Sequence, residues 1–390
     1  MNFDTPIERR NTYSTKWDKM ESIYGVSADE GVSMWVADTD FQAPPHVLNR
    51  LQEIVTHGVF GYASIEEDYR KAIQWWMANR HGWDIDTSMI FTTTGLCNAV
   101  ALCLDTYTQP GDGVVLFTPV YHAFARVTRA AGRDVVECPL VNNDGRYEMD
   151  FDAYDAQMTG SEKMVILCSP HNPGGRVWTR AELQGVADFC KRHDLLLISD
   201  EIHHDLVYPG HTHIPMPNVD PDILPRLIML TAPSKTFNVA GLHTGNVIIP
   251  DADLRARFSA RMTALALSPN SVGQFVAQAC YSPEGADWVD AQVAYLDGNR
   301  QLLDAAIAEI PGLKSMHLES TFLSWIDFAD TGMEQAEFTA RVEKQAKIAV
   351  NHGTTFGTGG ETFLRFNIGT QRANIETACA RLRDAFADLQ

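Results

Sequence analysis

Two charged residues stand where buried strands of this sequence are expected to end. Lys235 follows the apolar run LIMLTAPS and precedes TFNVAGL, so it leaves a strand for a loop. Burial there would lower the pKa of its amine, which is the condition that an imine-forming lysine needs; the alternative is a surface lysine whose stem covers apolar atoms. Asp200 follows LLLIS. A carboxylate at that place caps a loop, binds a metal, or faces a cationic ligand such as a pyridinium nitrogen.

Three other strand ends carry groups that could hold a flat, phosphorylated ligand. Gly95 follows MIFTTT and precedes a helix-like stretch over 98–107, and backbone amides at such a turn can bind phosphate. Tyr121 could stack on a flat ring or pack in the core. Asn172, in SPHNPGG, offers an amide, although Asn-Pro and Gly-Gly also form plain turns. Each signal is weak alone, and their common position at strand ends favours a single site.

These residues need a sheet whose strands end at one edge. Short apolar runs lie at 89–94, 114–119, 134–139, 164–170, 195–201, 227–235 and 246–251. Helix-like stretches at 122–131 and 180–193 separate some of them, and Thr179 with Glu182 has the spacing of a capping box. This alternation predicts an α/β fold with a mixed, mostly parallel sheet sandwiched by helices. Ligands of such sheets bind beyond the carboxyl ends of the strands.

The pattern changes toward the C-terminus. TFLSWIDF (321–328) and ETFLRFNIG (361–369) alternate polar and apolar residues around a helix-like stretch over 335–347. This predicts a smaller α+β domain whose sheet is exposed on one side. The first forty or so residues are too few for a domain and should pack on it. We therefore expect a large α/β domain over 45–285 and a small domain from both chain ends, 1–44 and 286–390.

Composition excludes several classes of partner. Acidic residues outnumber basic ones by 50 to 31 among 390 residues, which gives a formal charge of −19. Such a surface repels nucleic acid and anionic lipid, so we expect neither as a partner. No apolar run approaches the roughly 18 residues of a membrane span, and the first residues lack the apolar core of a secretory signal. Seven scattered cysteines without a CxxC pair indicate a reducing, cytoplasmic setting.

Four ordered motifs carry a family resemblance. SPHNPGG (169–175), DEIHHDL (200–206), SKTFNVAGL (234–242) and FLRFNIG (363–369) resemble those of fold-type-I pyridoxal-phosphate enzymes, the aspartate aminotransferase superfamily. The resemblance covers nearly the whole chain and implies pyridoxal 5′-phosphate as the cofactor. It implies that Lys235 forms the Schiff base and that Asp200 pairs with the pyridine nitrogen. It also places Asn172 and His203 near the phenolic oxygen and stacks Tyr121 on the ring.

The same resemblance implies how the cofactor phosphate and the substrate are held. Gly95, Leu96 and Ser234 would bind the phosphate. Tyr62, in FGYAS, would reach the phosphate of the neighbouring subunit, which implies a homodimer. Arg365 would bind the substrate carboxylate through two parallel hydrogen bonds.

Within the superfamily, the chain looks like the MalY/PatB group of cystathionine β-lyases, or C–S lyases. The segments RRNTYSTKWD (9–18) and MWVADTDFQAPP (34–45) carry this likeness together with DEIHHDL. The second segment would line the substrate entrance, with Ala37 at the substrate and Thr39 where Met is common. Ala232 and His243 stand where many aminotransferases have a serine and an arginine for the phosphate. This departure favours the lyase group.

The implied activity is pyridoxal-phosphate-dependent cleavage of cystathionine or related L-cysteine S-conjugates to a thiol, pyruvate and ammonia. Lys235 would be the base, Asp200 would hold the ring protonated, and Tyr121 could donate a proton. An aminotransferase is the alternative within enzymes. A regulatory protein that binds the cofactor without turnover is the alternative from another class.

Other motifs are given less weight. His203, His204, His211 and His213 could suggest zinc, but no cysteine accompanies them at ligand spacing and His203 is assigned to the cofactor, so we expect no metal. The glycine-rich run at 356–360 lacks the lysine and helix of a P-loop. No GxGxxG follows a strand, which disfavours a nicotinamide enzyme.

Overall fold

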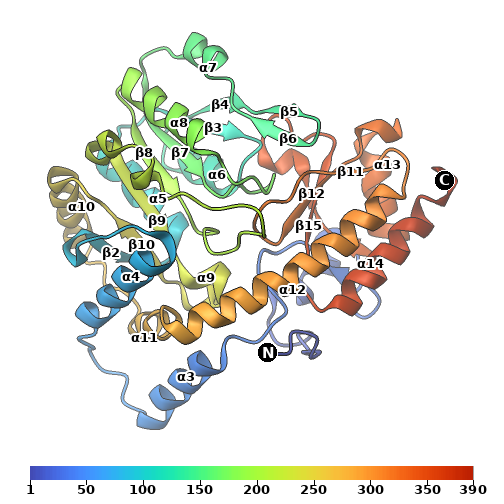
Figure 1. The fold of residues 1–390 in the computed structure, drawn as a ribbon, viewed down its shortest axis with the longest axis horizontal. Helices are drawn as coiled ribbons and strands as arrows, with labels where there is room; N and C mark the ends of the chain where they lie inside the picture. The colour runs from blue at the N-terminus through green and yellow to red at the C-terminus, as the bar shows by residue number, and fades with distance from the viewer. Residues whose placement is uncertain (390) are drawn as a thin grey trace.

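The computed structural model describes residues 1–389, and a seven-stranded sheet forms its centre (Figure 1). The strand order is β2-β10-β9-β8-β7-β3-β4. The strands are β2 (Ile90–Thr93), β3 (Gly113–Thr118), β4 (Asp134–Pro139), β7 (Glu162–Cys168), β8 (Leu196–Asp200), β9 (Leu227–Thr231) and β10 (Gly245–Ile248). Only β10 runs antiparallel to its neighbours. The mixed, mostly parallel sheet predicted from the sequence is confirmed.

Both faces of this sheet are buried under helices. The helices of this part are α5 (Leu96–Tyr107), α6 (Ala123–Ala130), α7 (Phe151–Gln157), α8 (Arg180–Arg192) and α10 (Ala252–Ala264). Alternate strand residues point to opposite faces. Val165 therefore packs with Phe189 of α8 in one core cluster, whereas Ile166 packs with Phe258 of α10 in another. The unbroken apolar strands follow from this double burial.

Local signals place the helix ends that matter for the site. The capping box of α8 is present, because the Thr179 side chain and the Glu182 side chain each bond the backbone of the other residue. α5 begins at Leu96, two residues before the stretch predicted from the sequence, with Gly95 as its N-cap. Gly95 has φ +102°, a conformation that glycine adopts readily and other residues rarely do.

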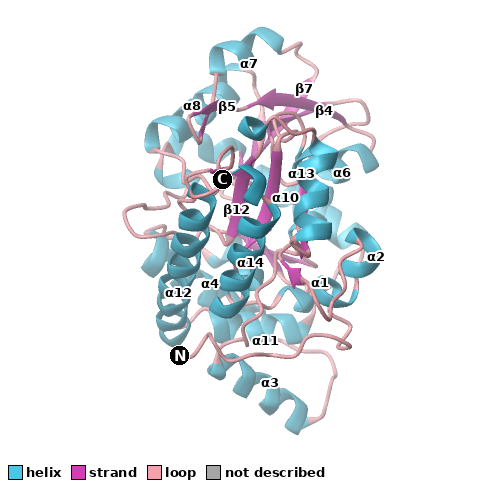
Figure 2. Ribbon diagram, turned by 90° about the vertical axis from the view of Figure 1, so that its right-hand side faces the viewer, coloured by secondary structure: helices cyan, strands magenta, loops and turns pink. Residues whose placement is uncertain are grey.

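The remaining helices frame the sheet and the N-terminal part of the chain. They are α1 (Thr15–Asp18), α2 (Met20–Tyr24), α3 (Pro45–His57), α4 (Glu66–His81), α9 (Pro233–Thr236), α11 (Ser271–Cys280), α12 (Pro283–Ala308), α13 (Gln335–Ala340) and α14 (Arg372–Ala385). In the side view, α7 and α3 lie at opposite ends of the molecule with strands between them (Figure 2). None of the described helices is long and apolar enough to cross a bilayer.

A second, four-stranded antiparallel sheet is built from the C-terminal part. Its order is β11-β12-β15-β14, with bounds Lys314–Ser315, Leu323–Asp327, Phe363–Asn367 and Asn351–His352. The predicted exposed face is wrong, since β12 and β15 are buried along almost their whole length. Leu364 and Phe366 pack into the core that includes residues of α12 and α14, whereas Phe363 packs with Trp325 in the core of the large sheet. The polar residues between them, Arg365 and Asn367, are buried as well and bond backbone carbonyls of the N-terminal segment.

The N-terminal segment joins this second part of the fold. Strand β1 (Val32–Ser33) pairs in parallel with β13 (Ile348–Ala349), and β5 (Val141–Asn143) forms a hairpin with β6 (Arg146–Glu148). α13 ends at Ala340 and is followed by a π-helical stretch over Arg341–Gln345, so the helix predicted over 335–347 is not regular.

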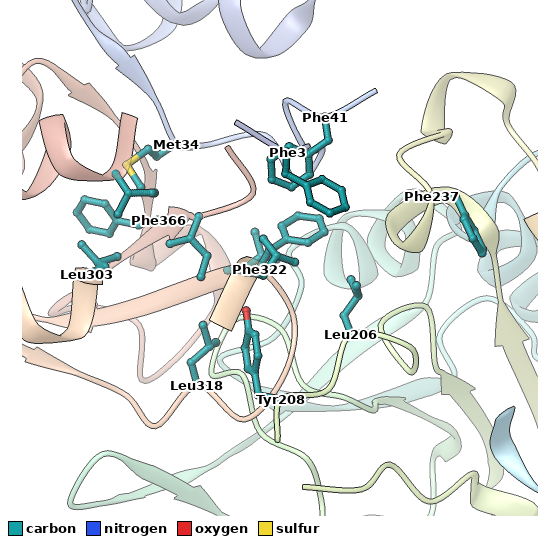
Figure 3. Close-up of a cluster of buried hydrophobic side chains, with 14 of the residues drawn as sticks. Phe3, Met34, Phe41, Leu206, Tyr208, Phe237, Leu303, Leu318, Phe322 and Phe366 are labelled. Atoms are coloured by element: carbon teal, nitrogen blue, oxygen red, sulfur yellow. The ribbon is translucent and has the colours of Figure 1, made fainter. Parts of the chain in front are cut away.

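Apolar side chains from distant parts of the sequence form one core beside the site. Phe3, Phe41 and Met34 of the N-terminal segment lie in the same cluster as Phe322 and Phe366 (Figure 3). The long helix α12 runs from α11 to a position beside α14 (Figure 1). This shared core is what brings the N-terminal loop onto the carboxyl ends of the strands.

Candidate active site

Lys235 lies one turn beyond β9, in the short helix α9. Its amine donates a hydrogen bond to the Ala37 carbonyl oxygen at 2.7 Å. Burial lowers the pKa of Lys235 below the usual lysine value, and the charges of Asp38 and Asp200 oppose that shift. The structure therefore brings the predicted lysine and the predicted Ala37 together through the backbone of Ala37. A lysine with a lowered pKa is suited to act as a nucleophile or base.

Asp200 is the last residue of β8 and is 4% exposed. Its Oδ1 accepts a hydrogen bond from the Ile202 amide at 3.1 Å, and it forms no ion pair with any residue among 1–389. Burial raises the pKa of Asp200 to about 7. A buried carboxyl without a cationic partner is costly as an anion, and a protonated ring nitrogen beside it would restore the charged form.

The N-terminus of α5 offers donors for a phosphate. The amides of Leu96 and Cys97 have no hydrogen-bond acceptor within the described chain, and no side chain caps this helix. The space where a Cβ of Gly95 would point is open. Free amides and the helix dipole together favour an anion at this turn. Ser234 is half-buried in α9, directly before Lys235, and its predicted role at the phosphate stays a prediction.

Asn172 and Arg365 meet at the centre of the site. Arg365 Nη1 donates to Asn172 Oδ1 at 3.0 Å, and both residues are buried. Because a guanidinium only donates, the amide oxygen must face Arg365 and the amide nitrogen is left to donate elsewhere. That orientation suits a donor to the phenolic oxygen of the cofactor.

Arg365 is a buried cation without a counter-ion in the described chain. Its other partners are the Trp35 carbonyl at 3.0 Å and the Asn351 side-chain oxygen, and its Nε has no partner. The guanidinium carbon lies 4.9 Å from the centre of the Phe356 ring. Burial lowers the pKa of Arg365 to about 10. These surroundings leave the guanidinium able to gain strongly from a carboxylate ligand.

His203 and Tyr121 lie close enough to the charged groups of the site for those charges to shift their pKa values. His203 is 2% exposed, and its Nδ1 has no hydrogen-bond partner among the described residues. Burial holds its pKa well below the usual histidine value, with Lys235 and Arg365 adding to the effect. Burial also raises the pKa of Tyr121, so its hydroxyl stays protonated. The unpartnered nitrogen of His203 is consistent with a ligand that the chain itself does not supply.

The segment that carries Ala37 is held by residues that sequence reasoning missed. Asn238 accepts from the Thr39 amide and donates to the carbonyls of Thr39 and Phe41. Asp40, 2% exposed, pairs with Arg9 at 2.7 Å and with Lys16 at 2.9 Å. Asn238 stands inside SKTFNVAGL, so that motif could have identified it as a site residue.

A second asparagine fixes the same segment from the other side. Asn367 in β15 donates to the carbonyls of Val36 and Asp38. Thr39 itself is buried with its hydroxyl unpartnered in the described chain. The segment is therefore preorganised over Lys235 by bonds to its backbone, which fix its path without dictating its side chains.

Tyr62 does not reach this site within one chain. Its side chain is fully exposed in the loop after α3, and Val59 and Phe60 beside it are each 69% exposed. His243, which stands where many aminotransferases have an arginine for the phosphate, is likewise exposed, with φ +48°. The one-chain structure brings Lys235 close to Ala37, Asp200, His203 and Arg365, whereas Tyr62 lies on the surface.

Comparisons with known proteins fit this arrangement. The family model of class I and II aminotransferases matches residues 33–382. The chain is 37% identical to cystathionine beta-lyase PatB of Bacillus subtilis, over 99% of this chain and 100% of that protein. It is 32% identical to protein MalY of Escherichia coli, over 98% of each chain. The crystal structure of cystalysin from Treponema denticola, which contains pyridoxal 5′-phosphate, superposes with a TM-score of 0.94 at 36% identity, covering 100% of this chain and 99% of that one.

The chain belongs to the class I and II aminotransferase family of fold-type-I pyridoxal-phosphate enzymes, and within it to the group of PatB and MalY. Pyridoxal 5′-phosphate is its cofactor. The residues present fit that group, because Lys235, the unpaired Asp200 and Cys97 at the free N-terminus of α5 lie close enough to one another for their charges to shift each other's pKa values. When bound, the cofactor supplies an electron sink for charge that develops on the substrate α-carbon.

Proposed function

We propose that the protein is a carbon–sulfur β-lyase that cleaves cystathionine or related L-cysteine S-conjugates to a thiol, pyruvate and ammonia. The observation that carries the proposal is the buried Arg365, without a counter-ion in the described chain, in one site with Lys235 and Asp200. The likeness to a cystathionine beta-lyase and to cystalysin supports the lyase reaction over other chemistries of the family.

Each residue has a distinct task in this proposal. Arg365 binds the substrate α-carboxylate and so sets the position of the α-carbon. Lys235, with its lowered pKa, removes the α-proton as general base. Asp200 keeps the ring nitrogen protonated. The C–S bond then breaks with its electron pair going to sulfur, and the thiolate takes a proton, which the Tyr121 hydroxyl could donate.

Asn172 and the entrance segment support this chemistry by position. Asn172 is oriented by Arg365, so binding of the carboxylate and orientation of the amide are linked. The Ala37 carbonyl oxygen lies 2.7 Å from the Lys235 amine, so it can orient that amine whenever the amine is not bound to the cofactor. After cleavage, 2-aminoacrylate takes up water and yields pyruvate and ammonia, which balances the reaction without an added oxidant or co-substrate.

An aminotransferase is the alternative, because it would use the same lysine, aspartate and arginine. It differs in needing a keto acid as second substrate. The test is a panel of L-amino acids, namely cystathionine, S-methylcysteine and aspartate, each with and without 2-oxoglutarate. We expect pyruvate from the two thioethers without the keto acid. S-methylcysteine should react alongside cystathionine, since no second arginine of the quoted motifs is placed to bind a distal carboxylate.

Changing Arg365 to lysine should weaken substrate binding. A lysine cannot reproduce the two parallel hydrogen bonds to a carboxylate, and a charge-assisted bond is worth about 1.5–3 kcal/mol. We expect KM to rise by about 10- to 150-fold, with a smaller fall in kcat and unchanged cofactor content. Steady-state kinetics with cystathionine measure the effect, and Arg180→Lys, at an exposed position, is the matched control. An unchanged KM would remove Arg365 from the substrate site.

We further propose that the protein works as a homodimer whose sites each take Tyr62 from the neighbouring chain. The exposed apolar run Val59, Phe60 and Tyr62 supports an interface there. Subunits carrying Tyr62→Phe, mixed with subunits carrying Lys235→Ala, should regain about a quarter of wild-type activity, because half of random dimers are hybrids with one intact site. The control mixes Tyr62→Phe subunits with subunits that carry both Tyr62→Phe and Lys235→Ala, and it should show no recovery because no hybrid has an intact site. No recovery after confirmed exchange would show that Tyr62 acts within its own chain or not at all.

A further inference from the structure

A buried cluster of potential metal ligands follows β8 and is not used by the proposed chemistry. One ligand atom from each of Glu201, His204 and His213 lies within 4.8 Å of the other two. All three side chains are buried. A second group, made of His81, Asp205 and the same His204, has equally close ligand atoms. His204 is therefore the residue that both groups share.

The His204 ring has no hydrogen bond of its own. Its side chain is 1% exposed, and neither ring nitrogen makes a hydrogen bond among residues 1–389, although Nε2 lies 3.4 Å from Asp205 Oδ2. The ring stacks on His81 with 3.9 Å between centroids. Buried polar atoms are nearly always satisfied, and an imidazole nitrogen that is not satisfied presents a free lone pair. That lone pair is what a metal ion requires from histidine.

Glu201 has the capacity to be a second ligand. Its Oε1 accepts from Ser199 at 2.9 Å and from the Met216 amide at 3.0 Å, whereas its Oε2 is bonded only to His213 Nε2, at 2.6 Å. No lysine or arginine among the described residues pairs with this carboxylate. A fully buried carboxylate without a permanent cation gains from a bound cation.

Asp205 is less suited to that role. It already accepts hydrogen bonds from His81, Trp76 and Thr236, and Arg80 Nε lies 3.8 Å from it. Its oxygens are therefore committed to the protein. This difference favours the group around Glu201 over the group around Asp205.

We propose that Glu201, His204 and His213 bind one divalent transition-metal ion of the zinc type. Two imidazoles and a carboxylate are ligands that zinc accepts, with a fourth position left for water. The ion would replace the proton shared by His213 and Glu201, and that proton would be released to solvent. Ligand atoms of a tetrahedral site lie about 3.3 Å apart. His213 Nε2 and Glu201 Oε2, now 2.6 Å apart, would therefore move apart slightly, and the His204 nitrogen, within 4.8 Å of both groups, would move closer by about 1.5 Å at most.

The proposed metal site lies next to exposed residues of the chain, and a bound ion would link two segments of the fold. Residues 209–212, just before His213, are exposed. A bound ion would tie the segment that carries His213 to the end of β8, next to Asp200. It would act as a structural clamp and not as a participant in catalysis. This inference departs from the absence of a metal that we expected from the sequence, where the spacing of the histidines alone gave no reason for a site.

The test uses the holoenzyme, treated with a chelator and then desalted. Zn²⁺ or Co²⁺ is added alone, excess ion is removed, and bound metal is measured by elemental analysis. We expect one ion per chain, a Co²⁺ spectrum in the visible region typical of nitrogen and oxygen ligands, and a rise of about 2–5 °C in the unfolding temperature.

His204→Met is the informative variant, because methionine fills a similar volume and the ring it replaces makes no hydrogen bond. It should lose the ion and the rise in unfolding temperature, and His204→Leu should do the same. His211→Gln, at an exposed histidine two residues from His213, should behave as wild type. Failure of the wild type to retain metal, or equal retention by both His204 variants, would overturn the proposal. Neither result would bear on the lyase activity.

Discussion

The Lys235→Ala variant should lose β-elimination activity by about 10⁴-fold, the upper end of what a positioned general base contributes. The loss is this large because Lys235 both holds the cofactor and moves the α-proton. The measurement is pyruvate release from cystathionine at saturating substrate and cofactor. Lys163→Ala, at an exposed lysine that bonds only the Gly160 carbonyl, should retain wild-type activity.

A second readout separates a missing catalytic amine from a misfolded variant. Wild-type protein should be yellow, and borohydride should fix the cofactor covalently on Lys235, where peptide mapping locates it. In Lys235→Ala no peptide should carry the reduced cofactor. Finding the reduced cofactor on another lysine of the wild type would contradict the assignment of Lys235 as the lysine that binds the cofactor.

The Asp200→Asn variant should keep its cofactor and lose about 10²- to 10³-fold in kcat, a loss typical when a group that stabilises developing charge is removed. An asparagine is nearly the same size but cannot hold the ring nitrogen protonated. The buried position of Asp200, with its pKa raised to about 7, indicates a carboxyl that depends on a cationic partner. Absorbance measures cofactor content, and turnover of cystathionine measures the loss.

Asp155→Asn is a suitable control for that experiment. Asp155 is a carboxylate that pairs with Arg192 and His193 far from the strand ends of the site. Its loss should leave turnover unchanged. Near wild-type turnover of Asp200→Asn itself would mean that Asp200 only caps the loop through the Ile202 amide, the structural alternative that its position at a strand end always allowed.

Much of the site could be predicted because its signals are local. Lys235 and Asp200 each follow a continuous apolar run, and a parallel sheet places such strand ends at one edge. Gly95 precedes a helix, so its role as N-cap was within reach of the sequence. Arg365 stands in a short motif whose apolar neighbours face a core.

Other features depend on contacts between distant segments, which no local pattern encodes. Alternating polar and apolar residues in β15 predicted a face open to solvent, yet Arg365 and Asn367 are buried and donate to the carbonyls of Trp35 and Val36 in the N-terminal segment. The sequence of a strand does not show whether a polar side chain forms its hydrogen bonds with water or with another part of the protein. The hydrogen bonds from Asn238 to the segment around Thr39, and the burial of His204 without a hydrogen bond, also depend on contacts between distant segments.

The most direct test of the account is the product balance of the wild-type enzyme with L-cystathionine and no keto acid. The account predicts equal amounts of homocysteine, pyruvate and ammonia, accumulating over many turnovers, because elimination needs no second substrate. Addition of 2-oxoglutarate should not raise the rate. If instead no pyruvate forms, and amino groups are transferred rapidly once a keto acid is supplied, the lyase proposal is wrong and the protein is an aminotransferase.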